Sequence, residues 1–158
     1  MHIPDKISKW IRAKNWTLHE HQIRMFKSSE CSSQLLIAPT GSGKTLAGFL
    51  PTIADLYLNP SQKLHTLYIS PLKALASDIK RNLETPIEEL ELKISVEDRT
   101  GDTKQSIKKK QRVIPPNILL TTPESLALLM SYPEAPSIFS SLKRIIVDEI
   151  HAITESKR

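Results

Sequence analysis

Hydrophobic positions along the chain occur in short blocks separated by polar turns, and two kinds of block alternate. Six blocks have the pattern of helices, and they cover 5–13, 18–27, 45–57, 73–83, 104–112 and 123–131. Five shorter blocks are continuous or alternating apolar runs that predict strands, and they cover 34–38, 64–70, 92–99, 118–122 and 144–148. Strands that alternate with helices imply an α/β fold, a parallel sheet with helices on both faces.

The composition describes one globular domain: of 158 residues, 39% are apolar and 25% are charged. Cys31 is the one cysteine, which excludes intramolecular disulfides and a cysteine-rich metal site, so we expect a cytoplasmic location. No apolar stretch approaches the ~20 residues that span a bilayer, and the polar N-terminus lacks a signal core. The net charge of +5 permits an anionic partner without requiring one.

A turn with two glycines, 38–45, lies between an expected buried strand and a helix. Gly41 and Gly43 allow backbone conformations that aim successive N–H groups at one anion, and the following helix adds its dipole and free amides. Lys44 is suited to reach the β- and γ-phosphates of a nucleotide, and the Thr45 hydroxyl is suited to ligate Mg²⁺. The alternative is a glycine-rich turn with an exposed lysine.

The expected strand at 144–148 ends in two carboxylates, Asp148 and Glu149. Asp148 is suited to hold Mg²⁺, directly or through water. Glu149 is suited to orient or deprotonate an attacking water. Two solvated acids at a strand end are the alternative. His151 fits a nucleotide site, a contact with a partner domain, or a packed or solvated position.

Six segments in order along the chain match the motifs of one family: Gln22, 38–45, 70–76, 99–103, 121–126 and 148–151. The chain resembles the first RecA-like motor domain of a superfamily 2 DExH-box helicase. The residues of these segments most resemble the Lhr branch, and within it the bacterial ligase-associated DEXH-box DNA helicases. The resemblance covers nearly the whole chain and implies a RecA-like P-loop domain at 31–158, preceded by a helical segment at 1–30.

The resemblance implies an ATP-driven motor that translocates on single-stranded DNA, from 3′ to 5′, in DNA repair, with ATP and Mg²⁺ as cofactors. Catalysis would then rest on Glu149 and Lys44, and Mg²⁺ on Thr45 and Asp148. Gln22 would read the adenine edge, since a side-chain amide donates and accepts at once. The nucleotide-binding positions carried over are Gln22, Thr40, Gly41, Ser42, Gly43, Lys44 and Thr45.

Three further segments match those that line the nucleic-acid path in this family. The positions carried over are Ser70, Pro71, Lys73, Arg99, Gly101, Thr122, Pro123 and Glu124. Lys73 and Arg99 offer charge and Thr122 a hydroxyl, while a proline can open a helix whose free amides bind phosphate. Simple helix capping is the alternative, and it is strongest for the Thr122 segment.

Two other features of the sequence, a basic run and two tryptophans, fit either a functional or a structural role. The basic run 108–110 would join the nucleic-acid path if it lies on the side of Arg99, and is otherwise a solvated helix face. Trp10 is expected in the core, whereas Trp16 is undecided between the core and base stacking.

Motors of this superfamily use two RecA-like domains, and the second supplies arginines for phosphoryl transfer. Because the chain stops ten residues after Asp148, we expect a piece truncated after the acidic strand end, able to bind ATP but not to unwind alone. Expected partners are single-stranded nucleic acid (DNA favoured over RNA), the missing second domain and repair proteins such as a ligase, with no membrane. The alternatives are an RNA-dependent helicase and a non-motor nucleotide-binding module.

Overall fold

The computed structural model describes residues 3–28, 33–39 and 41–155, with the backbone alone for 153–155. Cys31 and Thr40, both named by the sequence analysis, lie outside the described residues. The chain forms two compact units, Met1–Pro60 with Leu90–Leu92, and Ser61–Glu89 with Lys93–Arg158. The sequence placed a domain boundary after residue 30, whereas these units divide at Pro60.

The described part of the first unit contains three helices: α1 (Asp5–Ala13), α2 (Glu20–Lys27) and α3 (Lys44–Leu58). The predicted bounds of α1 are confirmed, and α3 extends the predicted helix by one residue at each end. The side chains buried in these helices include Ile7, Ile11, Phe26, Phe49 and Leu50. Burial of such side chains is the main source of stability for short amphipathic helices.

The start of α2 differs from the prediction by two residues. The N-cap is His19, and its backbone N–H donates a hydrogen bond of 2.8 Å to the side-chain oxygen of Gln22. This bond between the N-cap and the third residue of the helix is one half of a capping box, and it fixes the helix start at Glu20. The first turn of α2 is thus fixed by the residue proposed to read adenine.

The two tryptophans of the first unit pack against one another. Trp16 lies edge-on to Trp10, with 5.4 Å between ring centroids, and half of its surface stays exposed. Edge-to-face pairs of this kind contribute stability beyond the area they bury. Trp16 is therefore a partner of the half-buried Trp10, with one side open.

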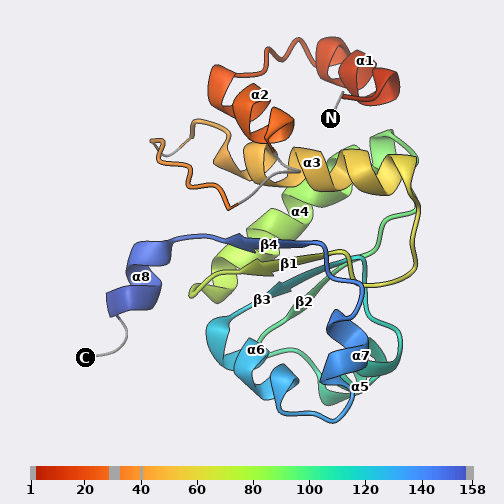
Figure 1. Ribbon diagram of the computed structural model, residues 1–158, viewed down its shortest axis with the longest axis vertical. Helices are drawn as coiled ribbons and strands as arrows, with labels where there is room; N and C mark the ends of the chain where they lie inside the picture. Colours follow the sequence, from red (N-terminus) through yellow and green to blue (C-terminus); the bar gives the residue numbers. More distant parts are fainter. Residues whose placement is uncertain (1–2, 29–32, 40, 156–158) are drawn as a thin grey trace. The chain divides into compact units, whose positions relative to one another are not determined.

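The second unit contains a parallel sheet of four described strands in the order β2-β3-β1-β4 (Figure 1). The strands are β1 (Thr66–Ile69), β2 (Val96–Arg99), β3 (Ile118–Thr121) and β4 (Arg144–Val147). In register, Thr121 pairs with both Ile69 and Arg99, and Ile69 pairs with Val147. The carboxyl ends of all four strands therefore share one edge, and four of the five predicted strands are confirmed over shorter ranges.

Helices cover both faces of this sheet, as predicted. The helices of this unit are α4 (Lys73–Glu89), α5 (Gln105–Val113), α6 (Pro123–Met130), α7 (Ala135–Phe139) and α8 (Ile150–Glu155), of which α8 lies beyond the end of β4 (Figure 1). Leu67 and Leu119 pack with Leu129 of α6 and Ile138 of α7, while α4 contacts β2 and β3 from the other side (Figure 1). Helices α7 and α8 were not predicted from the sequence. Among the described residues, none of the helices has both the length and the apolar character needed to cross a membrane.

The strand predicted at 34–38 is not formed. Described residues 33–39 are irregular, and Leu35 and Ile37 are 73% and 87% exposed. A strand needs a hydrogen-bonded neighbour, and every strand in the described part of the chain belongs to the second unit. The apolar run therefore leads into α3 without pairing.

Candidate nucleotide and nucleic-acid sites

The turn before α3 has the backbone geometry of a phosphate loop. Gly41 and Gly43 have φ angles of 78° and 77°, in the left-handed region that glycine adopts without a steric cost. Gly43 is the N-cap of α3, and its carbonyl accepts the first helical bond from Ala47 at 3.1 Å. The N–H groups of the first residues of α3 have no partner within the helix, and such groups form an anion site at a helix N-terminus.

Polar side chains of the same turn are arranged around its backbone. The Lys44 ammonium donates to the carbonyls of Ala38 at 2.7 Å and Pro39 at 2.9 Å. The Ser42 hydroxyl is buried and has no hydrogen-bond partner among the described residues. Since buried hydroxyls are nearly always satisfied, Ser42 fits a loop that receives an oxygen-rich ligand. Thr45, half-buried at the second position of α3, carries a hydroxyl of the kind that ligates Mg²⁺.

Gln22 lies directly against this turn. Its side-chain nitrogen donates to the Gly43 carbonyl at 3.1 Å, while its oxygen accepts from His19, and the residue is 3% exposed. A Cβ at Gly43 would come within 2.5 Å of that nitrogen. The amide keeps one further N–H and one further lone pair, so the structure joins Gln22 to the phosphate loop and leaves capacity for a ligand.

In the second unit, Asp148 directly follows β4 and is held by three hydrogen bonds. Its backbone N–H donates to the Ile69 carbonyl at 2.9 Å, which continues the pairing with β1. One carboxylate oxygen accepts from the Tyr68 hydroxyl and the other from the Glu149 N–H, each at 2.9 Å. The orientation of the proposed Mg²⁺ ligand is therefore fixed by its neighbours.

Tyr68 is a site residue that sequence analysis missed. It is buried within β1, and this burial, together with the nearby Asp148 carboxylate, raises the pKa of the phenol above its ordinary value. Its signal in the sequence was a tyrosine inside an apolar strand, because a buried hydroxyl needs a hydrogen-bond partner. The identity of the partner follows only from the pairing of β1 with β4.

Glu149 has a backbone conformation that is uncommon for its residue type. Its φ is 50°, in the left-handed region, which costs a non-glycine residue about 1 kcal/mol. One carboxylate oxygen lies 3.2 Å from the ring of His151, which is exposed. Sequence analysis left the role of His151 open, and the structure makes it a neighbour of the proposed water-activating carboxylate.

The segments proposed to line the nucleic-acid path follow three strands at the shared edge of the sheet. Ser70 is buried after β1, and its hydroxyl accepts from the Leu72 N–H at 3.3 Å. Lys73 opens α4, and its ammonium lies 3.0 Å from the Asp102 carboxylate in the loop after β2. This ion pair is exposed at both partners and hence weak, so the ammonium stays open to exchange with a phosphate.

The segment after β3 is a helix start. Thr122 is the N-cap of α6, its hydroxyl accepts from the Ser125 N–H at 3.4 Å, and Pro123 occupies the first turn. Glu124 is exposed beside them. The capping interpretation therefore holds for Thr122, and the free amides of α6 remain compatible with phosphate binding.

Arg99 does not present its charge to solvent, which corrects the expectation that it offers a charge to phosphate. It is 1% exposed, and its guanidinium donates to the Lys108 carbonyl at 2.9 Å and to the Gln111 side chain at 3.2 Å. Burial lowers the pKa of this guanidinium, which nevertheless stays charged. The basic run divides accordingly, since Lys108 points inward and Lys110 lies 3.5 Å from Glu97.

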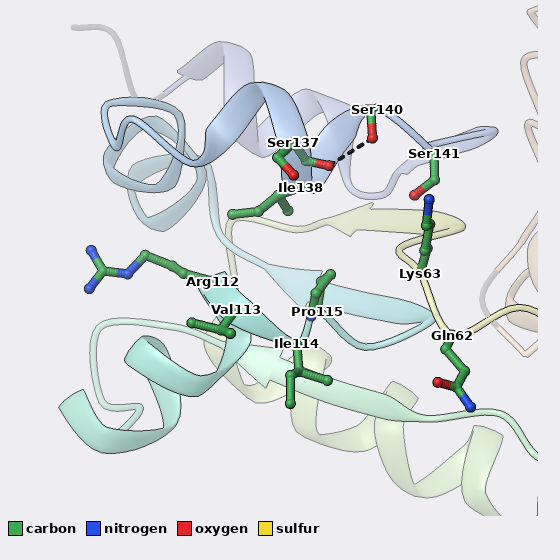
Figure 2. A pocket seen from close by; sticks show the side chains of 10 residues that line it. All are labelled: Gln62, Lys63, Arg112, Val113, Ile114, Pro115, Ser137, Ile138, Ser140 and Ser141. Atoms are coloured by element: carbon green, nitrogen blue, oxygen red, sulfur yellow. Dashed lines mark hydrogen bonds between the residues drawn. The ribbon is translucent and has the colours of Figure 1, made fainter.

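A separate pocket of about 220 Å³ lies at the other end of the strands (Figure 2). Its lining comes from segments that precede β1, β3 and β4: Gln62, Lys63, Arg112, Val113, Ile114, Pro115, Ser137, Ile138, Ser140 and Ser141. None of these is a predicted site residue. In parallel α/β sheets ligands bind beyond the carboxyl ends of the strands, so the loops at that edge are the better candidates.

The parallel sheet with its acidic strand end, and the glycine turn that opens a helix, are the features of a RecA-like nucleotide-binding domain. The family model of DEAD/DEAH box helicases matches residues 19–158. The chain therefore belongs to the DEAD/DEAH box helicase family, as the sequence motifs predicted.

Relatives of the chain are helicases of the Lhr type. ATP-dependent helicase Lhr-Core protein 2 of Thermococcus barophilus is 38% identical over 99% of this chain and 20% of its own length. ATP-dependent helicase Lhr-Core of Methanocaldococcus jannaschii is 40% identical over 96% of this chain and 20% of its own length. The chain thus spans about a fifth of the length of these curated relatives, and the predicted Lhr branch is confirmed.

Solved structures have the same fold. The structure of Mycobacterium smegmatis helicase Lhr bound to ssDNA and AMP-PNP matches with a TM-score of 0.87 and 37% identity, over 96% of this chain and 21% of that one. DUF1998 helicase MrfA bound to DNA and AMPPNP gives 0.84 and 32%, over 95% and 21%. DEAD-box helicase Mss116 bound to ssRNA and UDP-BeF, at 0.78 and 20% identity over 96% and 32%, shares the fold.

Proposed function

We propose that this chain is the ATP-binding part of an ATP-dependent DNA motor of the Lhr type. The observation that carries the proposal is the phosphate loop, with two left-handed glycines and the ammonium of Lys44 directed into the turn. Membership of the helicase family supports a motor rather than a non-motor nucleotide-binding module. The Lhr structure that holds both ssDNA and AMP-PNP supports the two ligands.

In this proposal each nucleotide-site residue has one task. Lys44 exchanges its carbonyl partners for β- and γ-phosphate oxygens, and Gln22 reads the adenine edge with its remaining donor and acceptor. Thr45 and Asp148 supply the hydroxyl and carboxylate oxygens that Mg²⁺ prefers, and the ion neutralises phosphate charge when bound. Glu149 orients or deprotonates the attacking water.

The nucleic-acid path is proposed to follow the carboxyl edge of the sheet in the second unit. The contributing positions are Ser70, Pro71, Lys73, Gly101, Thr122, Pro123 and Glu124. Support comes from the strand register, which brings the loops after β1, β2 and β3 to one edge, and from the contact of Lys73 with Asp102 across two of those loops. Binding through backbone amides and one ammonium would be independent of base sequence.

The finer features extend this proposal. We propose movement from 3′ to 5′ on single-stranded DNA in repair, in the cytoplasm, with a second RecA-like domain that supplies arginines and with repair proteins such as a ligase as partners. Unwinding of DNA duplexes carrying a 3′ or a 5′ tail tests the polarity in the longer protein. Equal unwinding of RNA duplexes would favour the RNA-dependent alternative.

The test of the nucleotide site is Lys44→Ala. Loss of a charge-assisted contact costs about 1.5–3 kcal/mol, so titration with Mg-ATP is expected to give at least a tenfold weaker dissociation constant. The matched control is Lys63→Ala, which removes the same charge from the pocket at the opposite end of the strands. Equal affinity of the parent and Lys44→Ala would remove the loop from the proposal.

A further inference from the structure

The position of Arg99 cannot be reconciled with direct contact to phosphate. It is the last residue of β2, and the loop 100–103 follows it. To reach solvent, its guanidinium would have to break its bonds to the Lys108 carbonyl and to Gln111. A buried charge that loses its partners is strongly unfavourable, so Arg99 is committed to the interior.

The partners of Arg99 connect β2 to α5. The amide of Gln111 accepts from Arg99 and donates to the Asp98 carbonyl at 3.1 Å and to a carboxylate oxygen of Glu97 at 2.9 Å. The carbonyl of Arg99 itself accepts from the Thr121 hydroxyl at 2.7 Å, from the neighbouring strand. Helix α5 is therefore held to the end of β2 by a network of hydrogen bonds that centres on the buried Arg99 side chain, and such networks add rigidity.

The same network reaches the loop after β2. Lys108, whose carbonyl accepts from Arg99, turns its own side chain back so that the ammonium donates to the Gly101 carbonyl at 3.1 Å. Within the loop, the Thr103 hydroxyl accepts from the Thr100 N–H at 2.9 Å. Arg99, Lys108 and Gly101 thus close a ring between the strand, the helix and the loop.

We propose that Arg99 is a positioning residue for nucleic-acid binding, which acts through Lys108 to fix the loop 100–103 and does not touch phosphate itself. The inference rests on the proposed nucleic-acid path. Arg99 holds the backbone of Lys108, and the Lys108 ammonium in turn holds the carbonyl of Gly101 in the loop. Lys73, whose ammonium is exposed and lies in a weak surface pair, is the contacting residue by contrast.

Salt dependence separates the two roles. Each phosphate neutralised on single-stranded DNA adds roughly 0.7 to the slope of log affinity against log salt. Replacing a contacting residue lowers that slope, whereas replacing a positioning residue weakens binding equally at every salt concentration. We measure anisotropy of a labelled oligothymidine with the complete chain and its variants over a salt series.

Arg99→Gln and Lys108→Met are the informative variants. Each is expected to weaken binding about tenfold, the scale of one charge-assisted hydrogen bond, with a slope parallel to the parent. Arg99→Lys, which keeps the charge but not the fork of donors, is expected to be as weak as Arg99→Gln. Because both changes break the same ring, the double variant is expected to be only slightly weaker than either single variant.

Thermal unfolding and Mg-ATP titration of each variant exclude a general loss of structure. If Arg99→Gln does not fold, Lys108→Met decides alone, since it keeps the carbonyl that Arg99 uses. A slope lowered by about 0.7 in Arg99→Gln and restored by Arg99→Lys would show a phosphate contact and overturn the inference. A parent that binds no DNA, or an unchanged slope in Lys73→Gln, would instead contradict the proposed path.

Discussion

Tyr68 donates a hydrogen bond of 2.9 Å to the carboxylate of Asp148, from the strand that pairs with β4. The second oxygen of that carboxylate accepts from the Glu149 N–H. A carboxylate with both oxygens anchored in this way has one orientation to offer a cation. Residues that orient a metal ligand contribute to the affinity of the site for its metal.

Tyr68→Phe removes the hydroxyl and keeps the ring in the core. The Mg²⁺ concentration that supports half-maximal ATP binding is expected to rise about ten- to a hundredfold, because Asp148 loses its anchor. Nucleotide titrations at a series of Mg²⁺ concentrations measure this. Tyr57→Phe, which removes a phenol elsewhere, is the matched control. If Tyr68→Phe matched its parent, Asp148 would need no orientation from β1.

The raised pKa of Tyr68 predicts a loss of stability in alkali. The folded protein holds the phenolic proton more tightly than the unfolded chain, in which tyrosine titrates near pH 10. The contribution is therefore fully present below about pH 10, and as pH rises further the free energy of unfolding falls by up to ~1.4 kcal/mol per pH unit. Urea unfolding at several pH values measures it, and the difference between parent and Tyr68→Phe isolates this one group.

The two glycines of the phosphate loop are expected to differ in their tolerance of alanine. Both changes force a left-handed conformation on a residue with a Cβ, at about 1 kcal/mol. Gly43→Ala also displaces the Gln22 amide, whereas a Cβ at Gly41 meets no described atom within 4 Å. Gly43→Ala should therefore cost about 1 kcal/mol more than Gly41→Ala in denaturant unfolding, the value of one hydrogen bond.

Adding Gln22→Ala tests the origin of that difference. The side chain is then absent, so Gly43→Ala should cost no more than Gly41→Ala in this background. Equal costs in the parent background would show that the contact between Gln22 and Gly43 contributes no stability.

Hydrolysis is expected to need more than this chain. An arginine supplied to the γ-phosphate is worth roughly 10³–10⁵ in rate, and the proposal assigns that group to a second domain. The 158-residue chain should therefore bind ATP and turn it over near background, with or without DNA. In the longer protein, Glu149→Gln should abolish DNA-stimulated phosphate release while ATP stays bound.

The matched control for the phosphate-release measurement is Glu88→Gln, which changes an exposed acid on α4. Robust DNA-stimulated turnover by the 158-residue chain would overturn the two-domain mechanism. Normal turnover by Glu149→Gln would remove Glu149 from the reaction.

Features that depend on nearby residues were predictable from the sequence. The bounds of α1 follow from the spacing of Ile7 and Ile11, and the left-handed turn at Gly41 and Gly43 follows from residue types alone. The alternation of strands and helices was enough to predict a parallel sheet with both faces covered.

Features that depend on distant partners were not predictable. The run 34–38 is apolar enough for a strand, but pairing requires a neighbour that the sequence does not name. Arg99 carries the charge expected of a phosphate contact, yet the packing of α5 turns that charge inward. Tyr68 became a site residue only through the register of β1 and β4.

The ammonium of Lys44 donates hydrogen bonds to the carbonyls of Ala38 and Pro39 within its own turn. An arriving phosphate must therefore compete with the backbone of the loop as well as with water. Nucleotide affinity therefore reflects the difference between the bonds of Lys44 to these carbonyls and its bonds to phosphate. A substitution that shifts either carbonyl would change the affinity for every nucleotide alike, whatever the base. In the proposed site, discrimination among bases would therefore depend on Gln22 of α2, and the overall strength of binding on the turn before α3.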